Sequence, residues 1–506
     1  MRTYAKPRTI AVASLCVFLA LAIAHSSRPP TADCTTEELR LPIPSGNAFG
    51  DLWMPPRTDQ PAAAVIVAHG YLANSRFMEV AFAKDLCNLR VAALFVDRRG
   101  HGRSDGMWRA PRDQRLEDLS PVVQAGIRAL RARGDIDGRR IGLIGHSDGA
   151  TEVLMAASYD WSIPFTVAIG ASVAPFEYVN YVVPKNLLLL YGRQDTYVRN
   201  YTDELLLDAA TRGELASEGQ TGRFDDGSAR RLERVAGAGH VDILFSRAAR
   251  QSTLDWVATG LGIAPVRASV ISFRWPVAGG LALLLIVLFS SGTPRGWAHW
   301  PARDAGVLFL AMIPAWSAGL FLVAHSRALF SFLPAQEVDT AVALLIIPAT
   351  LIAVTRRAIG GLRAPRHPLA KRADLLRAAI FALGIVAGIE LLATNLYVTA
   401  TTLDRAIISA GLFLLALPAF WVVCSSCDSA SSGITKLVYP ELAVAVLTAT
   451  LATPVFARMS ALPTLVFALS LAFAGAYRVS RSSPAGGALV GAVVFARCVT
   501  HVCALY

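Results

Sequence analysis

The strongest constraint on the fold of this 506-residue chain is a series of long apolar segments that begins near residue 275 and continues to the C-terminus. Helices of soluble proteins keep a polar face, and most of these segments lack one. A membrane-spanning helix needs about 20 predominantly apolar residues. The sequence therefore predicts an all-α, multi-pass membrane domain over residues 275–506, with about eight spans. These lie at 275–291, 305–324, 338–355, 378–400, 406–424, 441–457, 461–477 and 485–505.

The formal net charge of +11 is concentrated outside the part of the chain that looks globular. Basic and acidic residues nearly balance between residues 26 and 266, and the excess of Lys and Arg flanks the apolar segments. With a cytoplasmic N-terminus, the larger share of these basic residues falls on the inside, as the positive-inside rule requires. The charge thus predicts a cell-membrane protein whose globular part faces the periplasm or exterior. The globular part contains no stripe of basic residues of the kind that binds nucleic acid, so we expect no nucleic-acid partner.

The first 25 residues carry the pattern of an export signal. Arg2, Lys6 and Arg8 precede an uncharged apolar stretch from Ile10 to Ala24. This pattern predicts either a cleaved signal peptide or a retained signal-anchor helix, and both alternatives export the residues that follow.

Residues 31–263 alternate between short apolar runs and segments of helical periodicity. Short apolar runs bounded by Gly, Asp or Pro are typical of buried parallel strands. Strand–helix alternation predicts an α/β domain with a doubly wound, mostly parallel sheet. The expected strands lie at 65–68, 91–96, 140–144, 165–169, 186–190 and 231–235. Helical patterns lie between them, for example at 117–133 and 201–214, and the closing helix is expected at 243–260.

A strand, a tight turn and a helix are expected around Gly145-His146-Ser147-Asp148-Gly149, which fits the motif G-x-S-x-G. The motif alone is weak, but here a strand leads into it and a helix leads out of it. Gly145 and Gly149 would let the strand and the helix pass closely, and His146 occupies the variable position. The turn places Ser147 at a helix N-terminus, which favours developing negative charge. We therefore expect Ser147 to be a nucleophile.

A serine hydroxyl needs a base to take its proton, and in this architecture the chain order is nucleophile, acid, histidine. His240 is the only histidine between Ser147 and the apolar segments, and it follows the expected strand 231–235. It is the candidate base.

The candidate acid should follow a strand and lie between Ser147 and His240. Asp195 follows the apolar run 186–190, and it would hold the imidazole in the correct tautomer. Asp225 and Asp226 are alternatives, but they lie in a polar loop that follows no expected strand.

An oxyanion hole needs two backbone N–H donors. Asp148 supplies the amide that follows the nucleophile. The other is expected from the loop after strand 65–68, where Tyr71 follows His69-Gly70 and is the best candidate. We expect His69 to shape this loop.

Five motifs together resemble the α/β-hydrolase superfamily, and in particular its serine aminopeptidase, lysophospholipase and esterase branch. They are His69-Gly70, the string Asp97-Arg98-Arg99-Gly100-His101-Gly102-Arg103-Ser104-Asp105-Gly106, the Ser147 turn, Gly192-Arg193-Gln194-Asp195 and Gly239-His240. The resemblance covers about residues 40–262. It implies hydrolysis of an ester, thioester or amide through an acyl-enzyme, with no metal and no organic cofactor. Asp148 departs from the small or apolar residue often found after the nucleophile.

Two functions follow as hypotheses. The first is a membrane-bound serine hydrolase that acts on lipid-like or other acyl substrates at the bilayer, with membrane lipids as its partners. The alternative is a transporter, channel or sensor whose hydrolase-like domain binds or processes a ligand. Glu390 and Arg497 favour the alternative, because a charged residue inside a membrane span usually indicates a functional role. Their matching depths predict an intramembrane ion pair.

Seven cysteines are present. Cys34 and Cys87 both lie in the part expected to be exported, so a disulfide is one interpretation and a buried free thiol at Cys87 is another. Cys424 and Cys427 form a lone C-x-x-C at the end of an expected span, which is a weak signal for metal or redox chemistry.

Overall fold

The computed structural model describes two compact units of the chain. The first comprises residues 33–71, 73–106, 120–171, 179–195, 202–214 and 218–271. The second comprises 372–393, 403–426 and 484–502, with isolated helical positions at 342, 345–346, 349–350, 354, 472 and 476.

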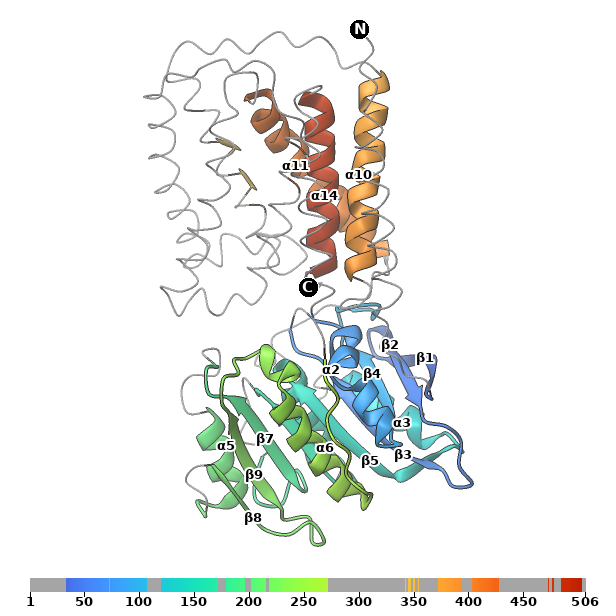
Figure 1. Ribbon diagram of the computed structural model, residues 1–506, viewed down its shortest axis with the longest axis vertical. Coiled ribbons are helices and arrows are strands. Elements are labelled where there is room, and N and C mark those ends of the chain that lie inside the picture. Colours follow the sequence, from blue (N-terminus) through green and yellow to red (C-terminus); the bar gives the residue numbers. More distant parts are fainter. Residues whose placement is uncertain are drawn as a thin grey trace. The chain divides into compact units, whose positions relative to one another are not determined.

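The first unit is built on one nine-stranded sheet with the order β1-β2-β4-β3-β5-β6-β7-β9-β8 (Figure 1). The neighbours from β4 through β3, β5, β6 and β7 to β9 pair in parallel, and the β1–β2, β2–β4 and β8–β9 pairs are antiparallel. This mostly parallel sheet, with helices on both faces, confirms the predicted α/β-hydrolase fold. The strands are Thr35–Ile43 (β1), Gly46–Met54 (β2), Ala62–Ala68 (β3), Ala92–Asp97 (β4), Ile136–His146 (β5), Thr166–Ile169 (β6), Leu187–Gly192 (β7), Gly219–Thr221 (β8) and Arg230–Val235 (β9).

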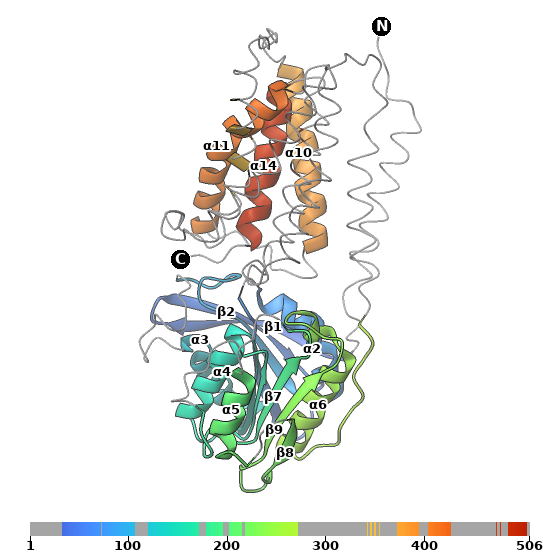
Figure 2. The ribbon, with the colours of Figure 1, turned by 90° about the vertical axis from the view of Figure 1, so that its left-hand side faces the viewer.

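The helices form two layers, one on each face of the sheet (Figure 2). Side chains of α2 and α6 share one core with Val65 and Val67 of β3, whereas α3 and α4 share another core with Ala64 and Ile66. Successive side chains of a strand point to opposite faces, so a strand covered on both faces, such as β3, is apolar at every position. The helices are Ser75–Asn88 (α2), Pro121–Arg131 (α3), Asp148–Tyr159 (α4), Thr202–Thr211 (α5) and Arg247–Leu261 (α6).

The structure differs from the expected elements in three places. The hairpin of β1 and β2 was not expected, because β1 is largely exposed and lacks a continuous apolar run. The short edge strand β8 was not expected either. The helix expected at 243–260 is divided into a 3-10 turn, Asp242–Phe245, and α6, because Ser246 between them is extended.

Both chain connections of the first unit are fastened to the end of α2. Cys34, just before β1, forms a disulfide with Cys87, and their Cα atoms are 6.2 Å apart. After α6 the chain returns to Asp85. The Asp85 carboxylate accepts a hydrogen bond from the backbone N–H of Ser269 at 2.8 Å and forms an ion pair with Arg250. The disulfide that the sequence left open is therefore present, and the last turn of α2 holds the entry and the exit of this unit.

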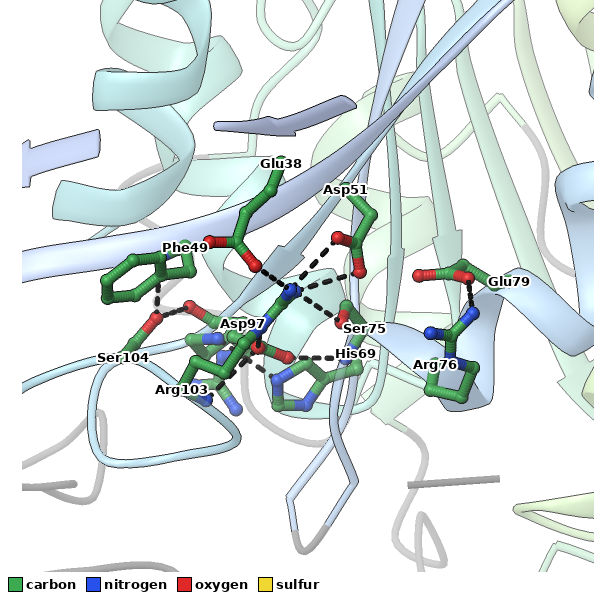
Figure 3. A network of polar contacts seen from close by, with 11 residues as sticks. Glu38, Phe49, Asp51, His69, Ser75, Arg76, Glu79, Asp97, Arg103 and Ser104 are labelled. Carbon is green, nitrogen blue, oxygen red and sulfur yellow. Dashed lines mark hydrogen bonds and ion pairs between the residues drawn. The ribbon is translucent and has the colours of Figure 1, made fainter. Parts of the chain in front are cut away.

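A network of polar side chains joins the β1–β2 hairpin to the loop after β4 (Figure 3). The Arg103 guanidinium contacts the carboxylates of Glu38 and Asp51 at 2.8 Å and that of Asp97 at 2.9 Å. Asp97 also accepts the N–H of Ser75, the first residue of α2, at 2.8 Å. A carboxylate that accepts a first-turn N–H does the work of a helix cap, so Asp97 fixes the start of α2.

Glu79 lies at the edge of this network, and its side chain is 2% exposed. It accepts a hydrogen bond from Arg76 at 2.7 Å, and the carboxyl group of Asp51 lies close enough to influence it. Burial, together with the charges of Asp51 and Asp97, raises the pKa of Glu79 to about 8, against the opposing effect of Arg76. Glu79 is therefore a neutral carboxyl at neutral pH.

Replacing Glu79 by glutamine should remove a pH dependence of stability. The unfolded chain releases the Glu79 proton near pH 4.3, whereas the folded protein keeps it up to about pH 8. Between these values the folded state binds the extra proton, so the free energy of unfolding of the wild type falls as pH rises, by about 1.4 kcal/mol per unit. The urea midpoint, followed by pulse proteolysis from pH 5 to 8, should decline less in Glu79→Gln. If the urea midpoints of the wild type and Glu79→Gln declined by the same amount from pH 5 to 8, the raised pKa of Glu79 would be contradicted.

Three helices are described in the second unit: Arg372–Ala393 (α10), Leu403–Ser426 (α11) and Pro484–Val502 (α14). They overlap the expected spans 378–400, 406–424 and 485–505. The rings of Phe420 and Phe495 meet edge to face, with centroids 6.4 Å apart.

Within the described residues, no helix has the length and apolarity needed to cross a membrane. Residues 1–25 and most of the other expected spans lie outside the described residues, as do Cys427 and the side chain of Glu390. The Arg497 side chain is half-buried on α14. The multi-pass membrane domain and the pairing of Glu390 with Arg497 stay predictions.

Candidate active site

Ser147 occupies a sharp turn between β5 and α4. Its φ of 54° and ψ of −120° lie where residues other than glycine are rare. Its N–H donates to the carbonyl oxygen of Ile169 at 2.8 Å, and its own carbonyl accepts the N–H of Ala150 at 2.9 Å. These two bonds hold the strained residue between β6 and the first turn of α4.

The two glycines of the motif are required by close packing, as expected. A Cβ on Gly145 would collide with the backbone of Gly149, and a Cβ on Gly149 would collide with the backbone of His69. Strand β5, helix α4 and the loop after β3 therefore approach one another at a distance that only glycine permits.

The structure brings the three predicted side chains together from the carboxyl ends of three strands. His240, after β9, places Nε2 at 2.9 Å from Ser147 Oγ, and its Nδ1 at 2.8 Å from Oδ2 of Asp195, which follows β7. Because a carboxylate accepts but does not donate, Nδ1 carries the proton, and Nε2 is the acceptor for the serine hydroxyl. The alternative acids bond within their own loop: Asp225 pairs with Arg223, and Asp226 accepts the N–H of Ser228.

His146 contacts the same histidine from the other side. Its Nε2–H donates to the carbonyl oxygen of His240 at 2.8 Å, and the two ring centroids are 5.1 Å apart. Burial and the neighbouring His240 lower the pKa of His146 to about 3, so it is a neutral donor at neutral pH. The sequence suggested His146 only as the variable position of the motif, because nothing in it signals a bond to residue 240.

Gly170, at the end of β6, lies beneath the imidazole of His240. Its φ is +57°, and a Cβ there would lie 3.2 Å from His240 Cε1. A side chain at this position would press on the ring that joins Ser147 to Asp195.

The loop after β3 runs beside the nucleophile. A Cβ on Gly70 would lie 3.0 Å from Ser147 Cβ, so the peptide that leads to Tyr71 passes directly along the turn. His69 Nδ1–H donates to the carbonyl oxygen of Gly70 at 2.7 Å, and His69 Nε2 accepts the N–H of Arg98 at 3.0 Å. Both ring nitrogens are thus engaged within this loop and its neighbour, as the loop-shaping role expected for His69 requires.

Asp148, whose acidic side chain departs from the pattern of the resembling branch, faces a buried cation. The guanidinium of Arg98 lies 3.7 Å from the Asp148 carboxylate and donates to Glu152 at 2.7 Å. The contacts of Arg98 with Asp148 and Glu152 were not predicted from the sequence, although the unusual acid at position 148 indicated that a positive partner was needed.

The arrangement has the parts required for nucleophilic chemistry on a carbonyl group: a hydroxyl, an imidazole, a carboxylate and two nearby amides. In the part of the chain that the structure describes, no group of three or more His, Cys, Asp and Glu side chains is arranged so that it could hold a metal ion.

Comparison with known proteins gives a family match and several likenesses. Residues 59–212 match the family model described as serine aminopeptidase, S33. The thiohydrolase apmlB of Arthrinium phaeospermum is 28% identical over 127 residues, which cover 24% of this chain and 38% of that protein. The match thus spans well under half of that relative.

Two solved structures are each similar to under half of this chain. An esterase of Pyrococcus furiosus has a TM-score of 0.36 and 18% identity, and covers 45% of this chain and 94% of its own. A dienelactone hydrolase-like promiscuous phosphotriesterase from metagenomic libraries has a TM-score of 0.36 and 18% identity, with coverages of 45% and 96%. The observed fold and the family match together support assignment of this unit to the α/β hydrolases, and they support a hydrolase activity.

Proposed function

We propose that this protein is a membrane-bound serine hydrolase that cleaves an ester, thioester or amide bond through an acyl-enzyme on Ser147. The observation that carries the proposal is the hydrogen-bonded line from Ser147 Oγ through the imidazole of His240 to Asp195, with distances of 2.9 and 2.8 Å. Such a line is the arrangement in which an imidazole can activate an alcohol.

Acylation begins when Ser147 Oγ attacks the carbonyl carbon and His240 Nε2 takes the hydroxyl proton. The carbonyl oxygen becomes an oxyanion, which the N–H groups of Tyr71 and Asp148 stabilise. As the tetrahedral intermediate collapses, His240 returns the proton to the leaving group, and the acyl group stays on Ser147. Asp195 stabilises the imidazolium that forms between these steps.

Deacylation repeats these steps with water as the nucleophile. His240 takes a proton from water, and the hydroxide adds to the acyl carbon. As the second intermediate collapses, the bond from the acyl carbon to Ser147 Oγ breaks, His240 returns its proton to Oγ, and the acid is released. No step needs a redox partner, because no atom changes its oxidation state.

Two features support an exported, membrane-tethered enzyme. The disulfide between Cys34 and Cys87 is of the kind that persists in oxidising compartments. The apolar segments beyond residue 275 and the basic residues that flank them favour a membrane attachment with the hydrolase unit outside the cytoplasm. Tethering would raise the rate of encounter with lipid-like acyl substrates, which we therefore propose as the substrate class.

Labelling with a fluorophosphonate probe tests the enzymatic proposal. The purified full-length wild type should label, and Ser147→Ala should not, because the probe forms a covalent bond with an activated serine. Ser158→Ala is a matched control, since Ser158 lies on the same helix and its hydroxyl bonds the carbonyl of Met155. Absence of labelling in folded wild type, or labelling that survives Ser147→Ala, would remove the proposal and favour a ligand-binding role.

A further inference from the structure

A fully buried cation lies against both parts of the candidate oxyanion hole. Arg98 is the first residue after β4, and its side chain is 2% exposed. Burying a guanidinium is strongly unfavourable unless its charge is compensated, so a cation at this place calls for an explanation. Its side chain and its backbone reach different elements, and each element carries one of the two amide donors.

The side chain of Arg98 reaches the first turns of α4. Its Nη2 donates to Glu152 at 2.7 Å, and its Nη1 lies 3.7 Å from the Asp148 carboxylate. Two acids at positions i and i+4 of a helix repel each other, and Arg98 lies against both. Burial alone would lower the pKa of the Arg98 guanidinium, yet Glu152 and Asp148 raise it, so the cation persists. The helix start that presents the Asp148 amide is held by this contact.

The backbone of Arg98 reaches the other donor through His69. Because the Arg98 N–H donates to His69 Nε2 at 3.0 Å, that nitrogen is unprotonated and the proton lies on Nδ1. Nδ1–H then donates to the Gly70 carbonyl at 2.7 Å. Burial lowers the pKa of His69 to about 3, so this tautomer is not replaced by an imidazolium. The Gly70 carbonyl and the Tyr71 N–H belong to one planar trans peptide and point in opposite directions.

We propose that Arg98 is a positioning residue that fixes both amide donors of the oxyanion hole, the Asp148 N–H through its side chain and the Tyr71 N–H through its backbone and His69. The inference rests on the proposed function, since it concerns the stabilisation of an oxyanion formed at Ser147. Arg98 touches no reacting atom. Without its side chain, Asp148 and Glu152 would lose the cation that lies against both of them, beside the place where negative charge develops.

The test uses the rate of fluorophosphonate labelling of the full-length protein, because the probe's phosphoryl oxygen enters the same hole as an acyl oxygen. The final extent of labelling gives the fraction of protein molecules whose site is folded and able to react, which are called competent sites. The rate at saturating probe reports on these competent sites alone. We expect Arg98→Gln to lower this rate by about 10- to 100-fold, the scale of a misplacement of about 1 Å. The half-saturating probe concentration should stay within about threefold, since ground-state contacts are kept.

Two further variants separate positioning from folding. Glu152→Gln removes the negative charge that holds Arg98 Nη2. Glu152 is partly exposed, so this variant should fold even if Arg98→Gln does not. It should lower the saturating rate by about three- to tenfold. Arg98→Lys keeps the charge without the planar fork and should retain more activity than Arg98→Gln.

Arg250→Gln is the matched control, because Arg250 is equally buried and pairs with Asp85 on α2. It should lower the fraction of competent sites and leave their saturating rate unchanged. Wild-type saturating rates in both Arg98→Gln and Glu152→Gln would overturn this inference while leaving the proposed function intact. Loss of labelling in the wild type itself would instead overturn the proposed function.

Discussion

Replacing His240 by alanine is expected to lower kcat by about 10⁶-fold, because the loss of a base from such a set costs nearly as much as the loss of the whole set. Asp195→Asn should lower kcat by about 10⁴-fold, since an amide at this place favours the wrong tautomer of His240. The measurement is hydrolysis of an activated ester such as p-nitrophenyl butyrate by the purified full-length protein. Both variants should keep KM within a few-fold of the wild type, because neither side chain is expected to hold the acyl group.

The two acids in the nearby polar loop provide the control for Asp195. Asp225 and Asp226 are exposed and bond within that loop, so Asp225→Asn and Asp226→Asn should retain kcat within about twofold. If either of these variants lost activity to the extent expected for Asp195→Asn, the acid would have been assigned to the wrong residue.

The second large effect concerns stability. Removing the disulfide with the double substitution Cys34→Ser and Cys87→Ser should lower the free energy of unfolding of the hydrolase unit by about 4 kcal/mol, the chain-entropy value for a loop of this length. The bonded residues are 53 positions apart, and the closed loop contains β1, β2, β3 and most of α2. The urea midpoint of protection against pulse proteolysis, measured on the full-length protein, would report the change.

Reduction of the wild type provides the matched comparison. Dithiothreitol should shift the wild-type midpoint to that of the double variant and leave the double variant unchanged. Equal midpoints for oxidised wild type and double variant would show that the bond does not constrain the unfolded chain.

The fold and the convergence of Ser147, Asp195 and His240 were predictable because each rests on local patterns. The run Ala64 to Ala68 is apolar at every position since both faces of a central parallel strand are covered. The turn at Ser147 was recognisable because close packing demands glycine at 145 and 149. Asp195 and His240 follow strands whose carboxyl ends share one edge of the sheet, so their convergence follows from topology.

The contacts that join distant positions could not be predicted. His146 bonds the backbone of a residue 94 positions away, and a backbone carbonyl leaves no mark on the sequence. Arg98 belongs to a sequence motif, but the motif does not indicate its partner. Its pairing with Glu152 depends on how β4 and α4 are placed across the sheet. The pairing of Cys34 with Cys87 likewise needed three-dimensional placement.

The fastening of both chain connections to the last turn of α2 has a mechanical consequence. Tension that enters at Cys34 or leaves at Ser269 is taken up by Cys87, or by Asp85 and Arg250, before it reaches the sheet. A 14-residue helix is about 20 Å long, so this load is applied about 20 Å from Ser75, where the loop beside the nucleophile ends. We therefore expect the spacing of Ser147, His240 and Asp195 to change little when the connecting segments are pulled.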